Sequence, residues 1–442
     1  MFFTGQFGFM DQLFLDFTAR NEWTSTLAFT KYKNKGFFYP SVGMTWVMNE
    51  TLKLPEWIDL GKIRGAWSKV GNGLNAYTSN PLNWVTKSGS IGFNTTAPFA
   101  ELKPEMTTSI EFGTEWRFFG SRLEFDFTYY KTNTKNQLFS LDAPAGSEYN
   151  TYYINAGNIQ NTGVEIMMSG TPVMTKNFRW KTGLNFATNK NEAKELAGDA
   201  FPYFQFNGGE SNNVWSRLEV GGSFGDIYGT TFVRDESGKI KFEKDKDGDE
   251  MPLVDKSSIK KLGNSTPDFN LSWSNTITWK DFSLYFLIDG RFGGDVMSLT
   301  EADLDQQGVS KASGDARDRG YVLLEGHRIS GGDENNKYRA INKFYNLVGG
   351  RAGVTEYYMY SATNIRLREL SLSYSLPRPL LNKVGIIKEA QISLVGRNLF
   401  FFKNNAPYDP DGMLSTSNRL QGVDVFGMPT NRSIGFNLKV NF

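Results

Sequence analysis

Residues 121–130 read SRLEFDFTYY, and apolar and polar side chains alternate along this stretch one by one. One face of the stretch carries Leu123, Phe125, Phe127 and Tyr129, and the other carries Glu124, Asp126, Thr128 and Tyr130. Because successive side chains of a strand point to opposite faces, the alternation predicts a β-strand between apolar and polar surroundings.

The same alternation recurs along the whole chain and is most regular at its end. Residues 433–442 place Ile434, Phe436, Leu438, Val440 and Phe442 opposite Gly435, Asn437, Lys439 and Asn441. About thirteen such strands are predicted, near residues 1–9, 12–29, 36–48, 61–70, 104–118, 121–135, 160–172, 177–190, 266–279, 281–294, 356–376, 388–403 and 430–442. Many exceed the roughly 5–6 residues of a globular strand and reach the 9–11 or so of a tilted membrane strand.

One predicted strand changes phase in its middle. Its apolar positions are odd-numbered up to Leu367 and even-numbered from Leu370 onward. A one-residue β-bulge near Arg368–Glu369 would restore the pattern, because a bulge inserts one residue into a ladder.

The links between the predicted strands alternate between short and long. Short links are expected at Met10–Asp11, Phe119–Gly120, Pro172–Lys176, Lys280 and Pro377–Ile387, and long polar links at 71–103, 136–159, 191–265, 295–355 and 404–429. Short turns on one side and long loops on the other are typical of an outer-membrane barrel. Aromatic clusters at strand ends then predict interfacial girdles, at Phe37–Tyr39, Trp116–Phe119, Tyr357–Tyr360 and Phe400–Phe402. The alternative is that these rings form the core of a β-sandwich.

The composition excludes several classes of function. The 442 residues contain 48 Lys and Arg against 47 Asp and Glu, so a net charge of +1 gives no basic field that would attract nucleic acid. Aromatic residues make up 15% of the chain and glycines number 45, which fits many strands joined by tight turns. The absence of cysteine excludes disulfides, thiolate nucleophiles and cysteine-based zinc sites.

The predicted strands, rather than a helix, would have to cross a membrane. No stretch approaches the roughly 18 apolar residues of a membrane-spanning helix. The N-terminal MFFTGQFGFMDQLFLDF has neither a basic region nor a small-residue cleavage site, so it does not resemble a signal peptide. For an exported protein, the signal is therefore expected upstream. Thirteen strands are an odd number, whereas a complete bacterial barrel normally has an even one, so we expect the chain to be incomplete.

An ordered series of segments resembles the SusC/RagA family of TonB-dependent transporters. These segments are residues 36–50 (GFFYPSVGMTWVMNE), 58–72 (IDLGKIRGAWSKVGN), 102–119 (LKPEMTTSIEFGTEWRFF), 155–173 (NAGNIQNTGVEIMMSGTPV), 243–296 (from EKDKDGDE to GRFGGDV), 364–377 (NIRLRELSLSYSLP), 380–402 (LLNKVGIIKEAQISLVGRNLFFF), and the closing 406–413 (APYDPDGM) and 422–442 (GVDVFGMPTNRSIGFNLKVNF). Each segment alone is a weak signal, but their order along nearly the whole chain is specific.

The resemblance implies an all-β, antiparallel transmembrane barrel. In that family a barrel of 22 strands is closed by an N-terminal plug, and a TonB box contacts the energising inner-membrane complex. Residues 1–442 would form a single barrel domain, the C-terminal thirteen or so strands, without the plug. The chain would lie in the outer membrane, with long loops extracellular and the C-terminus periplasmic. A SusD-like surface lipoprotein would act as a lid that captures glycans or peptides.

The acidic run Asp245, Asp247 and Asp249 resembles a calcium-binding loop. Alternate carboxylates can converge on a hard cation. An EF-hand loop, however, has Gly at position six and Glu at position twelve, whereas Gly248 and Lys256 stand at positions four and twelve here. The alternative is a solvated, turn-rich loop that binds no metal.

No catalytic constellation is found, and we expect the protein not to be an enzyme. His327 is the single histidine, and no GxSxG motif precedes it. Two carboxylate pairs could suggest a glycosidase, namely Glu111 with Glu115 and Glu124 with Asp126. Their spacing puts each pair on the polar face of a strand, where a water-filled lumen accounts for them.

Two further sets of residues have predicted roles, and both depend on the family resemblance. The alternating apolar residues of the last strand, ending on an aromatic, are expected to be the insertion signal that the outer-membrane machinery recognises: Phe436, Leu438, Val440 and Phe442. Ligand contacts are expected in the long loops, where aromatic rings can stack on sugars: Tyr77, Trp84, Tyr408, Asp409 and Asp411.

The sequence therefore predicts a segment of a TonB-dependent importer of oligomeric nutrients, with a glycan as the favoured ligand. Three alternatives remain open. A passive porin would close all 442 residues into an even-stranded conducting barrel. A soluble extracellular carbohydrate-binding β protein would remain in solution without detergent. A glycoside hydrolase would show measurable turnover.

Overall fold

A computed structural model describes residues 1–142, 146–198, 201–206, 211, 213–324, 328–329, 337–382, 385–412 and 421–442. The chain divides into two compact units, one of Met1–Phe204, Glu219–Gly222 and Ser272–Tyr285, the other of Gln205–Leu218, Ser223–Leu271 and Phe286–Phe442. No helix among the described residues is long and apolar enough to cross a membrane.

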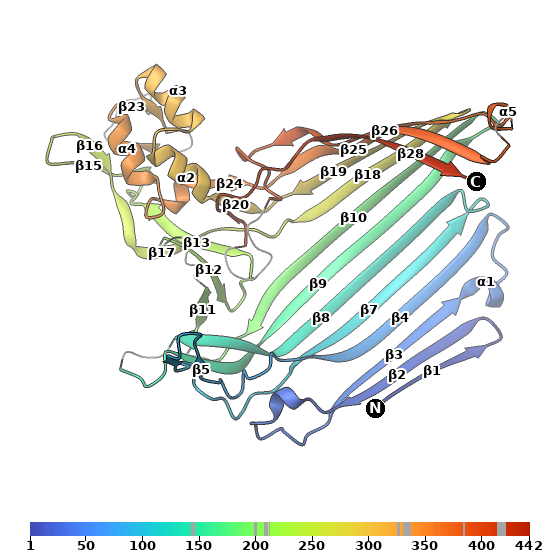
Figure 1. Ribbon diagram of the computed structural model, residues 1–442, viewed down its shortest axis with the longest axis horizontal. Coiled ribbons are helices and arrows are strands. Elements are labelled where there is room, and N and C mark those ends of the chain that lie inside the picture. The colour runs from blue at the N-terminus through green and yellow to red at the C-terminus, as the bar shows by residue number, and fades with distance from the viewer. Residues whose placement is uncertain are drawn as a thin grey trace. The chain divides into compact units, whose positions relative to one another are not determined.

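The main element is a sheet of thirteen strands in the order β1-β2-β3-β4-β7-β8-β9-β10-β18-β19-β25-β26-β28. Its strands are β1 (Phe2–Phe9), β2 (Leu13–Glu22), β3 (Phe37–Val47), β4 (Ile58–Asn72), β7 (Glu105–Phe118), β8 (Leu123–Asp142), β9 (Thr151–Met174), β10 (Phe178–Glu195), β18 (Phe269–Trp279), β19 (Phe282–Phe292), β25 (Asn364–Ser375), β26 (Glu389–Asn404) and β28 (Ser433–Asn441). Each corresponds to one predicted strand, and Figure 1 shows β1, β2, β3, β4, β7, β8, β9 and β10 side by side in sequence order.

Several predicted boundaries were wrong. The strand expected over 12–29 ends at Glu22, because Thr24 caps a 3-10 helix at Ser25–Leu27. The strand expected over 356–376 begins at Asn364, after a second 3-10 helix, Thr355–Tyr358. The long link expected over 136–159 is mostly strand, because the pairing of β8 with β9 extends from Leu123↔Gly170 to Asp142↔Thr151.

The sheet has one apolar and one polar face, as the alternation predicts. Directly paired residues share a face, so Val42, Trp67 and Ile110 form one row across β3, β4 and β7. All three are exposed, Ile110 by 54%. A row of exposed apolar side chains is costly in water and favourable against lipid.

The polar face carries ion pairs between neighbouring strands. Arg64 on β4 donates to both carboxylate oxygens of Asp126 on β8, at 2.9 and 2.8 Å. Glu115 pairs with Lys62 and, at 2.8 Å, with Arg117. The carboxylates suggestive of a glycosidase are thus held partly by cations, and Glu124 accepts a hydrogen bond from Ser169.

Tight turns join the strands at one end of the sheet. Met10 and Asp11 have φ values of 50° and 55°, and Lys280 has φ of 52°, as two-residue hairpin turns require. The links at this end are short, whereas those at the opposite end include 73–104, 196–268 and 293–363. The predicted sorting of short and long links between the two ends is therefore confirmed. The link predicted over 136–159 is shorter than expected and covers only residues 143–150.

A bulge is present near Arg368–Glu369, as predicted, but its extra residue is not in the predicted strand. Leu367 pairs with Phe400 and Glu369 pairs with Arg397, so Arg368 alone faces Asn398 and Leu399. The extra residue lies on β26, where Asn398 adopts φ of 49°.

Long links of the second unit form a module with its own apolar core. Its strands are β12 (Val214–Glu219), β13 (Asp226–Phe232), β14 (Lys239–Ile240), β15 (Phe242–Lys244), β16 (Glu250–Pro252), β17 (Val254–Asn264), β20 (Asp295–Ser298), β21 (Val322–Leu323), β22 (Arg328–Ile329), β23 (Lys337–Tyr338), β24 (Met359–Ser361) and β27 (Val423–Asp424). Its helices are α2 (Leu299–Gln306), α3 (Lys311–Arg319) and α4 (Ile341–Val348). Phe232, Leu299, Phe344 and Tyr358 are buried together in the core.

The remaining elements are short. They are the helices α1 (Met48–Thr51) and α5 (Arg378–Leu381), the hairpin of β5 (Trp84–Val85) with β6 (Ile91–Gly92), and β11 (Tyr203–Phe206). The helices α1 and α5 lie in links at the short-turn end, whereas the β5–β6 hairpin lies in a long link.

Candidate ligand site

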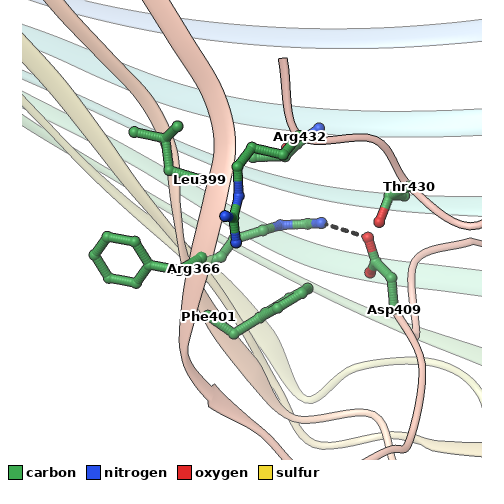
Figure 2. A pocket seen from close by; sticks show the side chains of 8 residues that line it. Arg366, Leu399, Phe401, Asp409, Thr430 and Arg432 are labelled. Atoms are coloured by element: carbon green, nitrogen blue, oxygen red, sulfur yellow. Dashed lines mark hydrogen bonds and ion pairs between the residues drawn. The ribbon is translucent and has the colours of Figure 1, made fainter. Parts of the chain in front are cut away.

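A pocket of about 250 Å³ opens beside the bulge of β25 and β26. It is lined by Arg366, Asn398, Leu399, Phe400, Phe401, Asp409, Thr430 and Arg432. Figure 2 shows Arg366 directed at Asp409, with Thr430 and Arg432 beside them. Two of the predicted ligand residues, Asp409 and Asp411, therefore lie at or next to a pocket.

Arg366 is the centre of an ion-pair network. Its side chain is 2% exposed, and its guanidinium lies over the Phe401 ring, 5.5 Å from the centroid. One terminal nitrogen donates to Asp409 at 2.8 Å, and the other pairs with Asp411. Because a buried guanidinium needs charged partners, the segment that carries both aspartates is held against β25.

A second layer of charges surrounds this pair. Arg368 donates to Asp289 of β19 at 2.6 Å, and the Arg366 Nε lies 3.9 Å from the same carboxylate. Arg291 pairs with Asp411 at 3.4 Å. Three arginines and three aspartates thus balance within the network. Arg432 adds one cation to the pocket wall and has no ion-pair partner among the described residues.

The aspartates are positioned by a tight turn in the sequence DPDG. The Asp409 carboxylate accepts from the backbone N–H of Asp411 at 3.0 Å, and the Asp409 carbonyl accepts from the N–H of Gly412 at 3.0 Å. This turn presents both carboxylates toward Arg366. Because both carboxylates are already bound to arginines, a polar ligand in the pocket would contact Thr430 and Arg432 instead.

Tyr408 is partly buried and is not an exposed ring on which a sugar could stack. It packs against a small core of Val296, Ala362 and Ala406, and its hydroxyl lies 3.5 Å from the Met297 carbonyl oxygen. Burial raises the pKa of the Tyr408 phenol above its ordinary value. The residue therefore anchors the loop that carries Asp409.

Tyr77 and Trp84 lie in the other unit and are exposed. Trp84 belongs to the β5–β6 hairpin, and its indole packs on Gly92, where an added Cβ would lie 2.3 Å from the ring. Tyr77 has φ of 64° in the preceding loop. An exposed indole supported on a backbone is suited to stacking on a planar face.

The acidic run of the predicted calcium loop surrounds a lysine. Asp245, Asp247 and Asp249 lie 2.7, 2.9 and 2.6 Å from the Nζ of Lys343 on α4. The ammonium lowers the pKa of Asp245, and the carboxylates raise that of Lys343. Among the described residues no group of three or more His, Cys, Asp or Glu could hold a metal ion. Calcium binding stays a prediction, and an ion would have to displace Lys343.

The predicted insertion signal lies on β28, the last strand of the sheet, except for Phe442, which follows the strand directly. Phe436 and Leu438 pair with Leu394 and Ile392 of β26, and Phe436, Leu438 and Phe442 are exposed. Val440 continues the same face opposite Ala390. His327 lies outside the described residues.

A family model described as TonB dependent receptor-like, beta-barrel matches residues 1–326. The chain belongs to this family. The family places it in the outer membrane, as part of a β-barrel. The barrel predicted from the sequence is thereby favoured over the soluble β protein and over the β-sandwich.

Named relatives agree with this assignment. TonB-dependent receptor P3 of Formosa agariphila is 24% identical over 459 residues, covering 96% of this chain and 44% of that protein. TonB-dependent receptor SusC of Bacteroides thetaiotaomicron is 28% identical over 242 residues, covering 50% of this chain and 24% of SusC. The predicted resemblance to the SusC/RagA type is confirmed. The chain spans less than half the length of these relatives.

The fold also matches solved structures. The RagAB peptide importer in its closed-closed state superposes with a TM-score of 0.74 at 19% identity, covering 99% of this chain and 47% of that one. Its open-open state gives a TM-score of 0.73 at 18% identity, covering 99% of this chain and 46% of that one.

The Arg366 network itself was not foreseen from the sequence. The sequence predicts Asp409 and Asp411 as ligand residues, but it predicts neither their arginine partners nor Asp289. The available signal was the change of phase near Arg368–Glu369, which marks the place where the strand leaves its regular pattern.

Proposed function

We propose that this chain forms part of the barrel wall of a transporter that imports oligomeric nutrients across the outer membrane. Import would be energised through TonB. Two observations support the proposal: the amphipathic thirteen-stranded sheet, and the match of residues 1–326 to the TonB-dependent receptor family. The long links would face the outside, and the short turns and the C-terminus would face the periplasm.

The proposed ligand is an oligosaccharide, with a peptide as the alternative. The exposed Trp84 suits a sugar face, whereas the Arg432 side of the pocket suits an anionic group on either ligand. One relative is named SusC, and a fold relative is described as a peptide importer. A SusD-like surface lipoprotein is the proposed partner at the long links, and a plug domain encoded outside these residues would contact TonB.

Uptake of labelled oligosaccharides and peptides by cells that carry the full transporter tests this function. We expect a protonophore to abolish uptake, because TonB-driven import needs an energised inner membrane, whereas a passive porin would continue to conduct. Uptake that persists at an unchanged rate in de-energised cells would refute the proposal and favour the porin.

Variants in the same assay test the ligand residues. Trp84→Ala and Arg432→Gln should each reduce uptake several-fold, since a stacked ring or a charged hydrogen bond contributes roughly 1–3 kcal/mol. Trp279→Ala is the matched control, because Trp279 is an exposed indole at the short-turn end. Equal uptake by Trp84→Ala, Tyr77→Ala, Tyr408→Ala and the wild type would remove the aromatic residues from the site.

A further inference from the structure

On two strands, β8 and β10, the apolar face of the sheet changes to a basic one toward the end with the long links. On β8 this face carries Leu123, Phe125, Phe127 and Tyr129, and then Lys131. On β10 it carries Leu184 and Phe186, and then Thr188 and Lys190. The lysine is the first charged residue on the face of each strand.

The strand register brings two of these lysines to one row. Lys131 of β8 pairs directly with Thr162 of β9, and Thr162 pairs directly with Lys190 of β10. Because directly opposed residues point to the same face, Thr162 stands between two lysines. Two interstrand spacings separate the lysines by about 10 Å at the backbone, which their long side chains can close.

Neighbouring positions of this face add positive charge. Beyond this change, β4 to β10 carry Lys69, Lys131, Lys135, Lys190 and Lys194 against two acids, Glu192 and Glu195. Lys190 pairs with Glu192 at 2.8 Å, and Lys194 pairs with the same carboxylate. Glu192 is therefore shared between two lysines, and a positive charge remains in excess. The polar face of the same strands, by contrast, mixes both signs.

The apolar column beneath the row has the depth of a membrane. Leu123 to Lys131 is eight residues, or roughly 27 Å along the strand, which a tilt of 35–45° reduces to about 20 Å. The apolar band of an outer-membrane barrel is about 25 Å tall. The row of Lys131, Thr162 and Lys190 therefore lies where lipid headgroups meet the apolar band. The next row toward the short-turn end is Tyr129, Val164 and Thr188, and the row after it is Phe127, Ile166 and Phe186.

We propose that Lys131, Thr162 and Lys190 form a binding site for the phosphate of a lipid headgroup in the outer leaflet. Two ammonium groups and a hydroxyl donate to the phosphate oxygens, and the acyl chains lie on the apolar column below. The site is on the lipid side of the wall and is separate from the pocket at Arg366. It rests on the proposed orientation of the barrel, with the long links outside.

The test is lipid binding to the purified full transporter, measured by native mass spectrometry in detergent. The probes are lipid A with both phosphates and the same lipid without phosphate. We expect the phosphorylated lipid to bind about 30-fold more tightly, because each lysine near a lipid surface contributes about a factor of five. Lys131→Gln with Lys190→Gln should lose that preference, whereas Lys131→Arg with Lys190→Arg should keep it.

Matched controls separate this site from general charge. Lys53→Gln with Lys176→Gln removes two exposed lysines at the short-turn end and should leave binding unchanged. Thr162→Ala removes the hydroxyl without altering charge and should weaken binding a few-fold, so the idea stays testable if the double variant does not fold. Inorganic phosphate in large excess should not displace the lipid.

Three results would overturn the site: equal binding of both lipids, wild-type selectivity in the glutamine double variant, or displacement by inorganic phosphate alone. None of them depends on uptake. A transporter that imports nutrients but shows no preference for the phosphorylated lipid refutes the lipid site and leaves the proposed function intact.

Discussion

Removal of the Asp409 charge should loosen the segment that closes the pocket. In Asp409→Asn the shape is retained, but Arg366, which is 2% exposed, loses a partner at 2.8 Å. Breaking a buried ion pair by neutralising one partner costs about 3–5 kcal/mol, and because Asp411 remains in contact we expect the lower end, about 3 kcal/mol. Local opening of the segment should then become about 100-fold more frequent.

Hydrogen exchange of the peptide covering residues 404–412 measures this opening. The N–H groups of Asp411 and Gly412 report it directly, because both donate to Asp409. Asp281→Asn, at an exposed short turn, is the control and should leave exchange in this peptide unchanged. The pair Arg366→Met with Asp409→Leu should exchange more slowly than Asp409→Asn, since no buried charge is left unpaired. Unchanged exchange in Asp409→Asn would refute the network as the clamp of this segment.

Three further predictions concern the loop module. Lys343→Met should strengthen calcium binding at Asp245 and its neighbours, because the ammonium no longer occupies the centre of the carboxylates; calorimetry that detects no calcium in either protein would dismiss the metal. Burial raises the pKa of the Asp305 carboxyl above 3.8, so the folded module binds the Asp305 proton more tightly than the unfolded chain does. The free energy of unfolding of the module should therefore fall as the pH rises above that value. Asp305→Asn should flatten this slope in proteolysis assays in urea at a series of pH values, and an unaltered slope would assign it to other groups. Gly353→Ala should destabilise the module by about 3 kcal/mol, because its Cβ would lie 1.9 Å from the Val348 carbonyl oxygen, whereas Gly73→Ala meets open space and should not change the thermal midpoint.

The strands of the sheet were predictable because their signal is local. Alternation over about ten residues is visible in the sequence, and each predicted strand exists. The extensions of β8 to Asp142 and of β9 from Thr151 were missed because their residues are largely polar or aromatic without a regular period. Hydrogen bonds to the partner strand, rather than side-chain pattern, determine where these strands end.

The loop module could not be predicted from local pattern. Its core joins Phe232, Leu299 and Phe344, which are separated by long intervals of sequence and carry no common period. The same holds for Lys343, which lies about a hundred residues from the aspartates it binds. Contacts of this kind depend on how the whole link folds, and a single sequence gives no direct sign of them.

The candidate site lies between these two cases, and the bulge is the reason. With an unbroken alternation, Arg366 and Arg368 would lie on the same face as Leu370 and Leu372, where a charge meets lipid at a cost of a few kcal/mol. The register shift between Leu367 and Glu369 takes the arginines out of that row, and their guanidinium groups meet Asp289, Asp409 and Asp411 instead. The change of phase is therefore the local cause of the site. Two charged residues that break the apolar row of a membrane strand next to such a change predict a buried ion-pair network, although the sequence cannot say which distant carboxylates complete it.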